Sequence, residues 1–425
     1  MTNLPPIVNL ATTLEGGAGI ALQRSHRALL AAGVDSHILV GHLKCTPSPT
    51  IAQCPRRRAS LLERGARRAG WLLDSSDRLT AAIDQAHRAK PDAAGYELFS
   101  PPHSRVRPEQ HVWLKPPALP HLHWVSRFID WPRFFSRVQG PVVVTLHDQQ
   151  NYLGGVHYAD DVTANPWLNP FEERVREIKR RALAGRRLSV IGNSDWNTRS
   201  AQNSGFFPLG TTFNSIPYAL DSTVFSPRPR AIAKSRLGIT PDRLVIGFAS
   251  DALANRRKGF DVLVQALRAL PDDLLPLTTL VSFGREPDPA VAVSVPLAWK
   301  HLGFLDADAA KADAYSAMDL FVVPSRAEAF GQTAIEAMAC GSAVIASQVG
   351  GLSEALDQGR AGLLVPPGQP DRLRDAIVHG LHATDRRAEL AATGRAHVVR
   401  QHAPERHAAA CIAVFTRLLA NRLNP

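Results

Sequence analysis

The chain has 425 residues, of which 49 are Lys or Arg and 38 are Asp or Glu, and its formal net charge is +11. This length predicts about two or three domains that each bury their own core, and the 45% hydrophobic content excludes a disordered chain, a collagen or a small disulfide scaffold. No uncharged apolar run reaches about 18 residues, so we expect no membrane-spanning helix. Without a secretory signal or a metal or redox spacing among the four cysteines, a cytoplasmic protein with reduced thiols is expected.

The positive charge is concentrated in the first half of the sequence. Residues 1–218 hold 26 basic and 17 acidic side chains, whereas residues 219–425 hold 23 and 21. Two stretches supply the excess: residues 56–68 carry six Arg and one Glu, and residues 171–187 carry seven basic and three acidic groups. A basic protein often binds nucleic acid or an anionic membrane. Because no aromatic residues are interleaved with these arginines, nucleic acid is not expected as a partner.

The first half begins with a β-branched run at residues 6–13, a glycine-rich turn and a helical pattern, which together predict a βαβ unit with its second strand at 36–41. A helical spacing then covers residues 56–90, and a second helix with acidic residues leading and basic residues trailing covers 171–187. Further strands are predicted at 121–125, 141–146 and 188–192.

Residues 216–230 contain three prolines and no periodicity, which is typical of a linker. Beyond it, short apolar runs again alternate with helical patterns, which predicts a second doubly wound parallel sheet. The expected domains are 1–218, joined by a C-terminal helix at about 404–425 that packs back, and 219–403. The strands of the second domain are predicted at 244–249, 278–283, 320–323, 343–346 and 362–365, and its helices at 258–270, 332–339 and from 371 onward.

The densest functional signal lies at residues 324–346, where Glu328 and Glu336 are separated by seven residues. We expect Glu328 in the loop after a strand and Glu336 in the first turns of the next helix. Ligands of doubly wound sheets bind at the carboxyl ends of strands. A single glutamate at a helix start needs no ligand, but the pair within this string indicates a site.

This arrangement suits sugar transfer. Carboxylates accept hydrogen bonds from sugar hydroxyls, and N–H groups at a helix N-terminus together with a cation stabilise a diphosphate. The cations available after the strand at 244–249 are Arg256, Arg257 and Lys258.

The string at 324–346 resembles the Glu-x7-Glu signature of retaining glycosyltransferases of family 4. The stretches 258–259, 350–354 and 362–365 also match that family. In the first half, residues 15–19 resemble its glycine loop. Residues 145–148 with 154–158 are similar to a subgroup that builds extracellular polysaccharide and lipid-linked glycans, although its cysteine-bearing insertion is missing here.

This resemblance implies the GT-B fold, in which two Rossmann-like doubly wound parallel-sheet domains face a central cleft. The first domain would bind the acceptor and the second a UDP- or GDP-sugar. The implied reaction moves a hexose, with retention and without a metal or other cofactor, to a glycan or a polyprenyl diphosphate-linked acceptor in cell-surface polysaccharide biosynthesis. The protein would be cytoplasmic and peripheral on the inner face of the plasma membrane.

The resemblance also implies roles for individual residues. Lys258 would neutralise the leaving diphosphate, Glu328 would hold the donor-sugar hydroxyls and Glu336 the ribose hydroxyls. His147 would lie near the reacting hexose, with Asp148 beside it in the substrate site. The remaining expected substrate-binding residues are Gly16, Gly17, Phe330, Gly331, Gln332 and Thr333.

One departure concerns the phosphate. Family members carry an Arg five or six residues before the Lys-Gly pair, but Leu253 and Ala252 stand there. Arg256 is our candidate for the missing charge, with Arg257 as the alternative.

Two other functions stay open, a non-catalytic protein that binds nucleotide sugars and a sugar-nucleotide epimerase of the same architecture. Asp306 and Asp308 fit a short metal-binding pattern, but we expect them to cap a helix over 309–318. His121 and His123 are expected to point to opposite faces of a strand, which argues against a shared metal.

The arginines of residues 56–73 flank an apolar helical side, so this stretch can lie on an anionic membrane. Each basic side chain would contribute about 1 kcal/mol. Replacing Arg57, Arg64, Arg67 and Arg68 with Glu should therefore release the protein from anionic liposomes in a sedimentation assay. Unchanged binding would mean that these arginines form only a solvated face.

Overall fold

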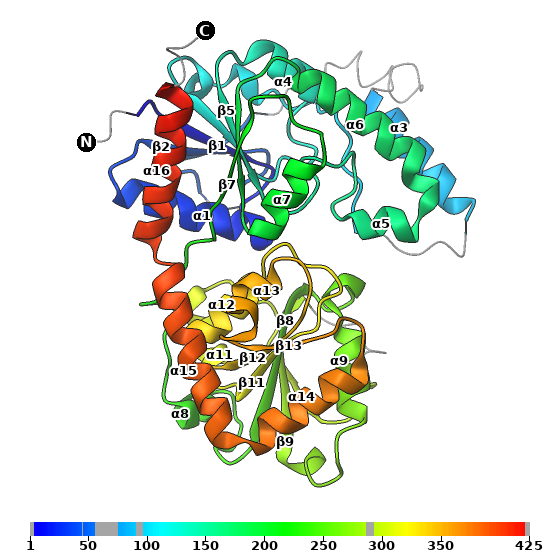
Figure 1. Ribbon diagram of the computed structural model, residues 1–425, viewed down its shortest axis with the longest axis vertical. Helices are drawn as coiled ribbons and strands as arrows, with labels where there is room; N and C mark the ends of the chain where they lie inside the picture. Colours follow the sequence, from blue (N-terminus) through cyan, green and yellow to red (C-terminus); the bar gives the residue numbers. More distant parts are fainter. Residues whose placement is uncertain (1–3, 45, 56–74, 91–96, 286–292, 421–425) are drawn as a thin grey trace. The chain divides into compact units, whose positions relative to one another are not determined.

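The computed structural model describes residues 4–44, 46–55, 75–90, 97–285 and 293–420. The chain forms two compact units (Figure 1). Unit 1 comprises Met1–Ile216 and His407–Pro425, and unit 2 comprises Pro217–Arg406. The expected boundary lay at 218/219, two residues beyond the observed one. Each unit is built on its own parallel sheet, so the prediction of two doubly wound α/β domains is confirmed.

Within the described residues, the sheet of unit 1 has seven parallel strands in the order β3-β2-β1-β4-β5-β6-β7. Its central strands are buried from end to end, as expected where helices cover both faces of a parallel sheet. Along β5, Val142 and Val144 belong to one apolar cluster and Val143 to another, because successive side chains point to opposite faces. The strands are β1 Ile7–Ala11, β2 Ser36–Val40, β3 Ile51–Gln53, β4 Leu119–Leu122, β5 Val142–Leu146, β6 Leu188–Gly192 and β7 Thr212–Ser215.

The C-terminal helix belongs to unit 1 from His407 onward. In α16, Phe415 and Cys411 share an apolar cluster with Ile7 of β1 and Leu29 of α1. The Arg187 guanidinium donates to the Leu418 carbonyl over 2.5 Å. The helices among the described residues of unit 1 are α1 Gly16–Ala31, α3 Ser75–Arg88, α4 Trp131–Arg137, α5 Ala159–Ala164, α6 Asn169–Leu183, α7 Asp195–Asn203 and α16 Pro404–Ala420.

Of the two basic stretches, residues 56–68 and 171–187, the structure describes only the second. Residues 56–74 lie outside the described residues, so α3 covers only the end of the helix predicted at 56–90. The helix predicted at 171–187 is α6, and part of its charge is turned inward. Lys179 is 0% exposed and donates to the carbonyls of Gln150 and Leu153. Burial lowers the pKa of Lys179 to about 7.

In the described part of unit 2, the sheet has six parallel strands in the order β10-β9-β8-β11-β12-β13. Its apolar cluster joins Ile246 of β8 and Val322 of β11 to Leu263 of α9 and Ile377 of α14. The strands are β8 Leu244–Ala252, β9 Thr278–Arg285, β10 Ala298–His301, β11 Leu320–Val323, β12 Ala343–Ser347 and β13 Leu363–Val365. The helices are α8 Arg230–Arg236, α9 Phe260–Arg268, α11 Asp308–Ser316, α12 Gln332–Ala339, α13 Leu352–Ala355, α14 Pro370–His382 and α15 Thr384–Gln401.

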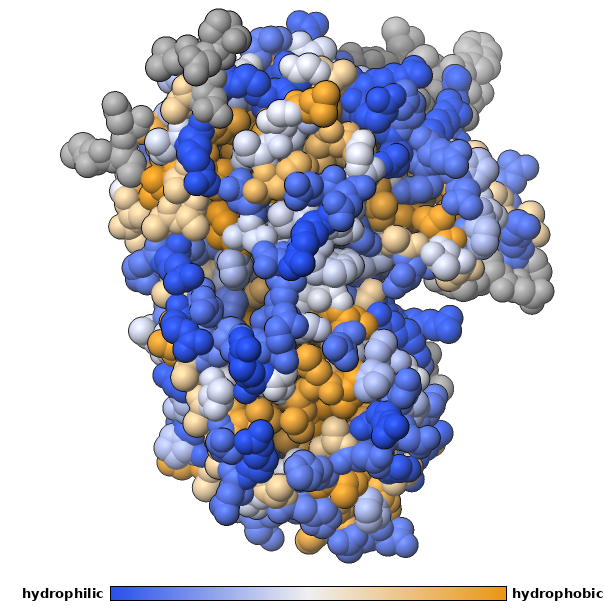
Figure 2. All heavy atoms as spheres, in the orientation of Figure 1, coloured by the Kyte–Doolittle hydropathy of each residue, from blue (hydrophilic) through white to orange (hydrophobic). Residues whose placement is uncertain are grey.

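Within the described part of the chain, none of the helices is long and apolar enough to cross a membrane. Figure 2 shows hydrophilic residues spread over the visible face of each unit, with apolar areas between them.

The loops that follow β8 and β11 come into close contact at Gly259. This residue has a φ of +72°, and a Cβ built on it would lie 2.0 Å from the Pro324 carbonyl oxygen. A side chain is therefore excluded twice, by the left-handed backbone and by the neighbouring loop.

Replacing Gly259 with Ala should lower the free energy of unfolding by about 3 kcal/mol, because backbone strain and a clash add together. The matched control is Gly368→Ala, where φ is +66° but nothing lies within 4 Å of the added Cβ. The control should cost only about 1 kcal/mol. Urea denaturation of both variants checks the difference, and equal losses would show that contact with Pro324 is not the constraint.

Candidate functional site

Two cationic side chains face one carboxylate at the carboxyl ends of β8 and β11. The Lys258 ammonium lies 2.5 Å from Glu328 Oε2, and Arg257 Nη1 lies 3.6 Å from the same oxygen. All three side chains are mostly buried: Lys258 is 25% exposed, Arg257 17% and Glu328 13%. Because β8 and β11 are paired and parallel, the loops that carry the three charges leave the sheet at the same edge.

A second set of contacts holds the loop with the two cations. The Asn255 side chain accepts from the Arg257 N–H and caps the 3₁₀ turn Arg256–Lys258. The Arg326 N–H donates to the Arg257 carbonyl over 2.7 Å, and its guanidinium spans both carboxylate oxygens of Asp261 at 2.8 and 2.7 Å. This hydrogen bonding outweighs partial burial and holds the pKa of Asp261 below its usual range.

Arg256, the cation that we predicted from the sequence, does not belong to the group of Lys258, Arg257 and Glu328. Arg256 is exposed, and its carbonyl accepts from Arg326. Its neighbour Arg257 faces Glu328 instead, because the tight turn rotates consecutive side chains to different sides. The sequence analysis did not identify Arg326 and Asp261, because they belong to no motif and their segments are distant in the sequence.

The predicted helix N-terminus is observed at α12. Gly331 is its N-cap, and Gln332 and Thr333 are its first two residues. The first N–H groups of a helix point out of its end rather than to helix carbonyls. Just before the helix, Phe330 is 4% exposed and packs against Tyr218.

Glu336 lies on the second turn of α12 and is 4% exposed. The Tyr315 hydroxyl, itself fully buried on α11, donates to Glu336 Oε2 over 3.0 Å. Tyr315 was not identified from the sequence. Glu328 is fixed through its backbone, because its carbonyl accepts from the N–H of Gly351 over 3.0 Å.

Asp308 was expected to cap the helix that follows it. The N-cap is instead Ala307, and Asp308 lies in the first turn of α11, where it pairs with Lys311 at 3.1 Å.

In unit 1, the residues predicted after β5 are held in a polar cluster. Asp148 Oδ2 accepts from His157 Nδ1 at 2.7 Å and from the Trp124 indole at 3.1 Å. Burial alone would raise the pKa of Asp148, but the charge and hydrogen bond of His157, with the Gln150 N–H, hold it below its usual range. Asp148 is therefore a carboxylate at neutral pH.

The same cluster has the connectivity of a Ser-His-Asp triad. His157 Nε2 lies 2.8 Å from Ser100 Oγ, which is also 2.5 Å from Ser126 Oγ. Ser100 is 0% exposed, so a substrate could not reach it as a nucleophile. We interpret the cluster as a buried network that fixes the loop carrying Asp148.

His147 directly follows β5 and is half-buried. Its Nε2 lies 3.0 Å from His123 Nδ1. Burial lowers the pKa of His147 to about 4, although Asp148 opposes the shift. The expectation that His121 and His123 point to opposite faces was wrong. Their ring centroids lie 4.2 Å apart, because side chains two residues apart share one face of a strand.

Gly16 and Gly17 are the first residues of α1, directly after the loop that follows β1. Gly17 is exposed, and Glu15, which directly precedes Gly16, pairs with Lys44 at 2.6 Å. These glycines and His147 follow strands of one parallel sheet, β1 and β5, and thus lie along the same edge of it.

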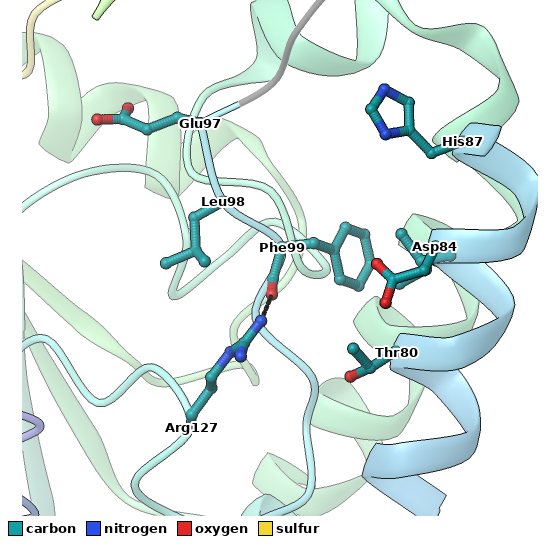
Figure 3. A pocket seen from close by; sticks show the side chains of 8 residues that line it. Thr80, Asp84, His87, Glu97, Leu98, Phe99 and Arg127 are labelled. Carbon is teal, nitrogen blue, oxygen red and sulfur yellow. Dashed lines mark hydrogen bonds between the residues drawn. The ribbon is translucent and has the colours of Figure 1, made fainter. Parts of the chain in front are cut away.

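Unit 1 also contains a cavity of about 280 Å³ beside α3. Figure 3 shows Asp84 and Thr80 on the helix side and Phe99 opposite, with Arg127 donating to the Phe99 carbonyl. Its described lining residues come from three separate segments of the chain, and none of them was predicted from the sequence.

Known proteins resemble this chain in sequence and in fold. The family model "Glycosyl transferases group 1" matches residues 243–383, which include Lys258, Glu328 and Glu336. A D-inositol 3-phosphate glycosyltransferase of Actinosynnema mirum is 31% identical over 297 residues, covering 65% of this chain and 67% of the relative. One from Stackebrandtia nassauensis is 36% identical over 200 residues, but this alignment covers only 43% of this chain and 44% of the relative.

Solved structures extend the similarity over nearly the whole chain. Sucrose-phosphate synthase from Thermosynechococcus elongatus superposes with a TM-score of 0.71 at 22% identity, covering 98% of this chain and 100% of that one. The Anabaena protein HepE, solved in complex with UDP-glucose, has a TM-score of 0.64 at 17% identity and covers 98% of each chain. At these identities the likeness shows the fold. This chain therefore has the GT-B fold and belongs to the glycosyltransferase group 1 family.

Proposed function

We propose that this chain moves a hexose from a UDP- or GDP-sugar to an acceptor hydroxyl with retention of configuration. The observation that supports it best is the partly buried group of Lys258, Arg257 and Glu328 at the carboxyl edge of the second sheet. Two cations beside one carboxylate suit a ligand that carries both a diphosphate and sugar hydroxyls. HepE, which shares the fold, was solved with UDP-glucose.

Each side chain of this group then has a task. Lys258 and Arg257 would neutralise the charge that develops on the leaving diphosphate, and the N–H groups of Gln332 and Thr333 would add their dipoles. Glu328 would accept from donor-sugar hydroxyls. Glu336, oriented by Tyr315, would accept from the ribose.

The same residues suggest a route for retention. Among the residues that the structure describes, no side chain at the site is an evident covalent nucleophile. We therefore propose that the departing phosphate oxygen takes the proton of the incoming hydroxyl on the same face of the sugar. We further propose that protein cations and N–H groups supply the positive charge, without a metal ion.

Unit 1 would bind the acceptor. His147 would contact the reacting hexose, Asp148 would contribute to the substrate site, and Gly16 and Gly17 would allow the backbone to approach a phosphate or the acceptor. The relatives are named for D-inositol 3-phosphate, which favours a small phosphorylated polyol over the glycan or polyprenyl diphosphate-linked acceptor expected from the motifs. A phosphorylated polyol and a polyprenyl diphosphate-linked acceptor are both anionic, in keeping with the basic surplus of residues 1–218. Attachment to an anionic membrane is proposed only with the lipid-linked class.

The first experiment offers the purified protein UDP-, GDP-, ADP- and dTDP-sugars with EDTA present. The acceptors are D-inositol 3-phosphate, unphosphorylated inositol and a polyprenyl diphosphate-linked sugar. We expect transfer to a phosphorylated acceptor, measured as nucleoside diphosphate release, and a product whose anomeric proton coupling shows retention. Donor binding without turnover would indicate the non-catalytic alternative, whereas donor epimerisation without diphosphate release would indicate an epimerase.

Lys258→Ala should lower kcat by about 100-fold, because one preorganised charge on the transition state is lost. The matched control is Lys311→Ala, which breaks another partly buried lysine–carboxylate pair of unit 2, to Asp308. That control should leave kcat close to wild type. Transfer that survives Lys258→Ala, or that strictly requires Mn²⁺, would contradict the assigned site.

A further inference from the structure

A chain of hydrogen bonds crosses four adjacent strands of the first sheet and ends at His147. It begins at Ser36 on β2 and passes through Asn9 on β1 to His123 at the end of β4. His123 then contacts His147 after β5. Asn9 and Ser36 are 0% exposed and His123 is 2% exposed, so water does not compete for these contacts.

The direction of the chain can be read from Asn9. Its amide nitrogen lies 2.9 Å from the His37 carbonyl oxygen and 3.0 Å from Ser36 Oγ. A backbone carbonyl only accepts hydrogen bonds, so this side of the amide must be the NH₂ group. The amide oxygen of Asn9 therefore faces His123 Nε2 at 3.1 Å.

This orientation determines the protonation of both imidazoles. An amide oxygen only accepts, so His123 Nε2 must carry a proton. Burial holds the pKa of His123 well below its ordinary value, so the ring is neutral and its Nδ1 has a lone pair. His123 Nδ1 must then accept from Nε2–H of His147, 3.0 Å away.

The Asn9 end of the chain is itself anchored. Ser36 Oγ lies 2.8 Å from His26 Nδ1, and His26 Nε2 lies 3.2 Å from Thr50 Oγ1. Because each end of the Asn9 amide has a partner of the required kind, a flip of the amide would lose contacts on both sides.

We propose that His123, oriented by Asn9, is a positioning residue that keeps the proton of His147 on Nε2 and its lone pair on Nδ1. His147 then acts toward the substrate as a hydrogen-bond acceptor, the form suited to a sugar hydroxyl and unsuited to a phosphate oxygen. The substrate part of this inference rests on the proposed function, whereas the tautomer does not.

The tautomer is tested first, without substrate. Nitrogen-15 NMR of histidine-labelled protein at neutral pH distinguishes protonated from unprotonated ring nitrogens, and His147→Gln assigns the His147 signals. We expect both His147 and His123 to be neutral with the proton on Nε2. A proton on Nδ1 of His147, or a doubly protonated ring, would overturn the proposal.

The role of His123 is tested by three variants. His123→Leu removes the acceptor and should lower kcat about tenfold, with a smaller change in donor KM and a mixed tautomer at His147. His123→Asn places an amide oxygen near the position of Nδ1 and should recover most of kcat. His121→Leu is the matched control, since this neighbouring buried ring contacts Thr145 rather than His147.

Thermal unfolding of the three variants separates positioning from packing. If His121→Leu lowers kcat as much as His123→Leu at a similar melting temperature, packing explains the effect and the proposal fails. It also fails if His123→Leu leaves both kcat and the His147 tautomer unchanged. Should the wild-type protein transfer no sugar at all, the proposed function fails, and the NMR result still decides the tautomer.

Discussion

The parallel pairing of β8 with β11 is the constraint on which the candidate donor site depends. Parallel neighbours release their following loops at one edge of a sheet, and here those loops carry Lys258 and Glu328. Their approach is close enough that only glycine fits at residue 259. The ion pair is thus a consequence of strand order, and the sheet supplies the rigidity that keeps charged side chains partly out of water.

The first sheet uses the same edge in a different way. Unit 2 gathers opposite charges there, whereas unit 1 places a buried network of neutral imidazoles, an amide and hydroxyls beside the Asp148 carboxylate. Such groups are stable inside a protein only when their donors and acceptors are matched. The matching gives the network a direction, so the protonation of His147 is determined by residues several strands away. The second sheet thus carries an ion-paired group at this edge, and the first carries a hydrogen-bond network with a defined direction.

Local patterns predicted most of the elements and pointed to Lys258 and Glu328, which the structure brings together. The strand before Glu328 and the helix that starts after Gly331 were predictable because hydrophobic runs and glycine punctuation act over a few residues. The choice between Arg256 and Arg257 was not, because the two alternate within one tight turn and only its rotation decides which faces Glu328. Strand geometry places His121 and His123 on one face, so the expectation of opposite faces was an error of interpretation.

The sequence by itself determined the two doubly wound units, the pair of glutamates and the likeness to glycosyltransferases, since these are properties of order and spacing along the chain. Only the tertiary structure decided the partners. Tyr315 on Glu336, Arg326 on Asp261 and Asn9 on His123 join segments that no local pattern links. The physical reason is that a buried polar group forms hydrogen bonds with the groups that tertiary packing places beside it. Those partners are distant in the sequence and belong to no local motif.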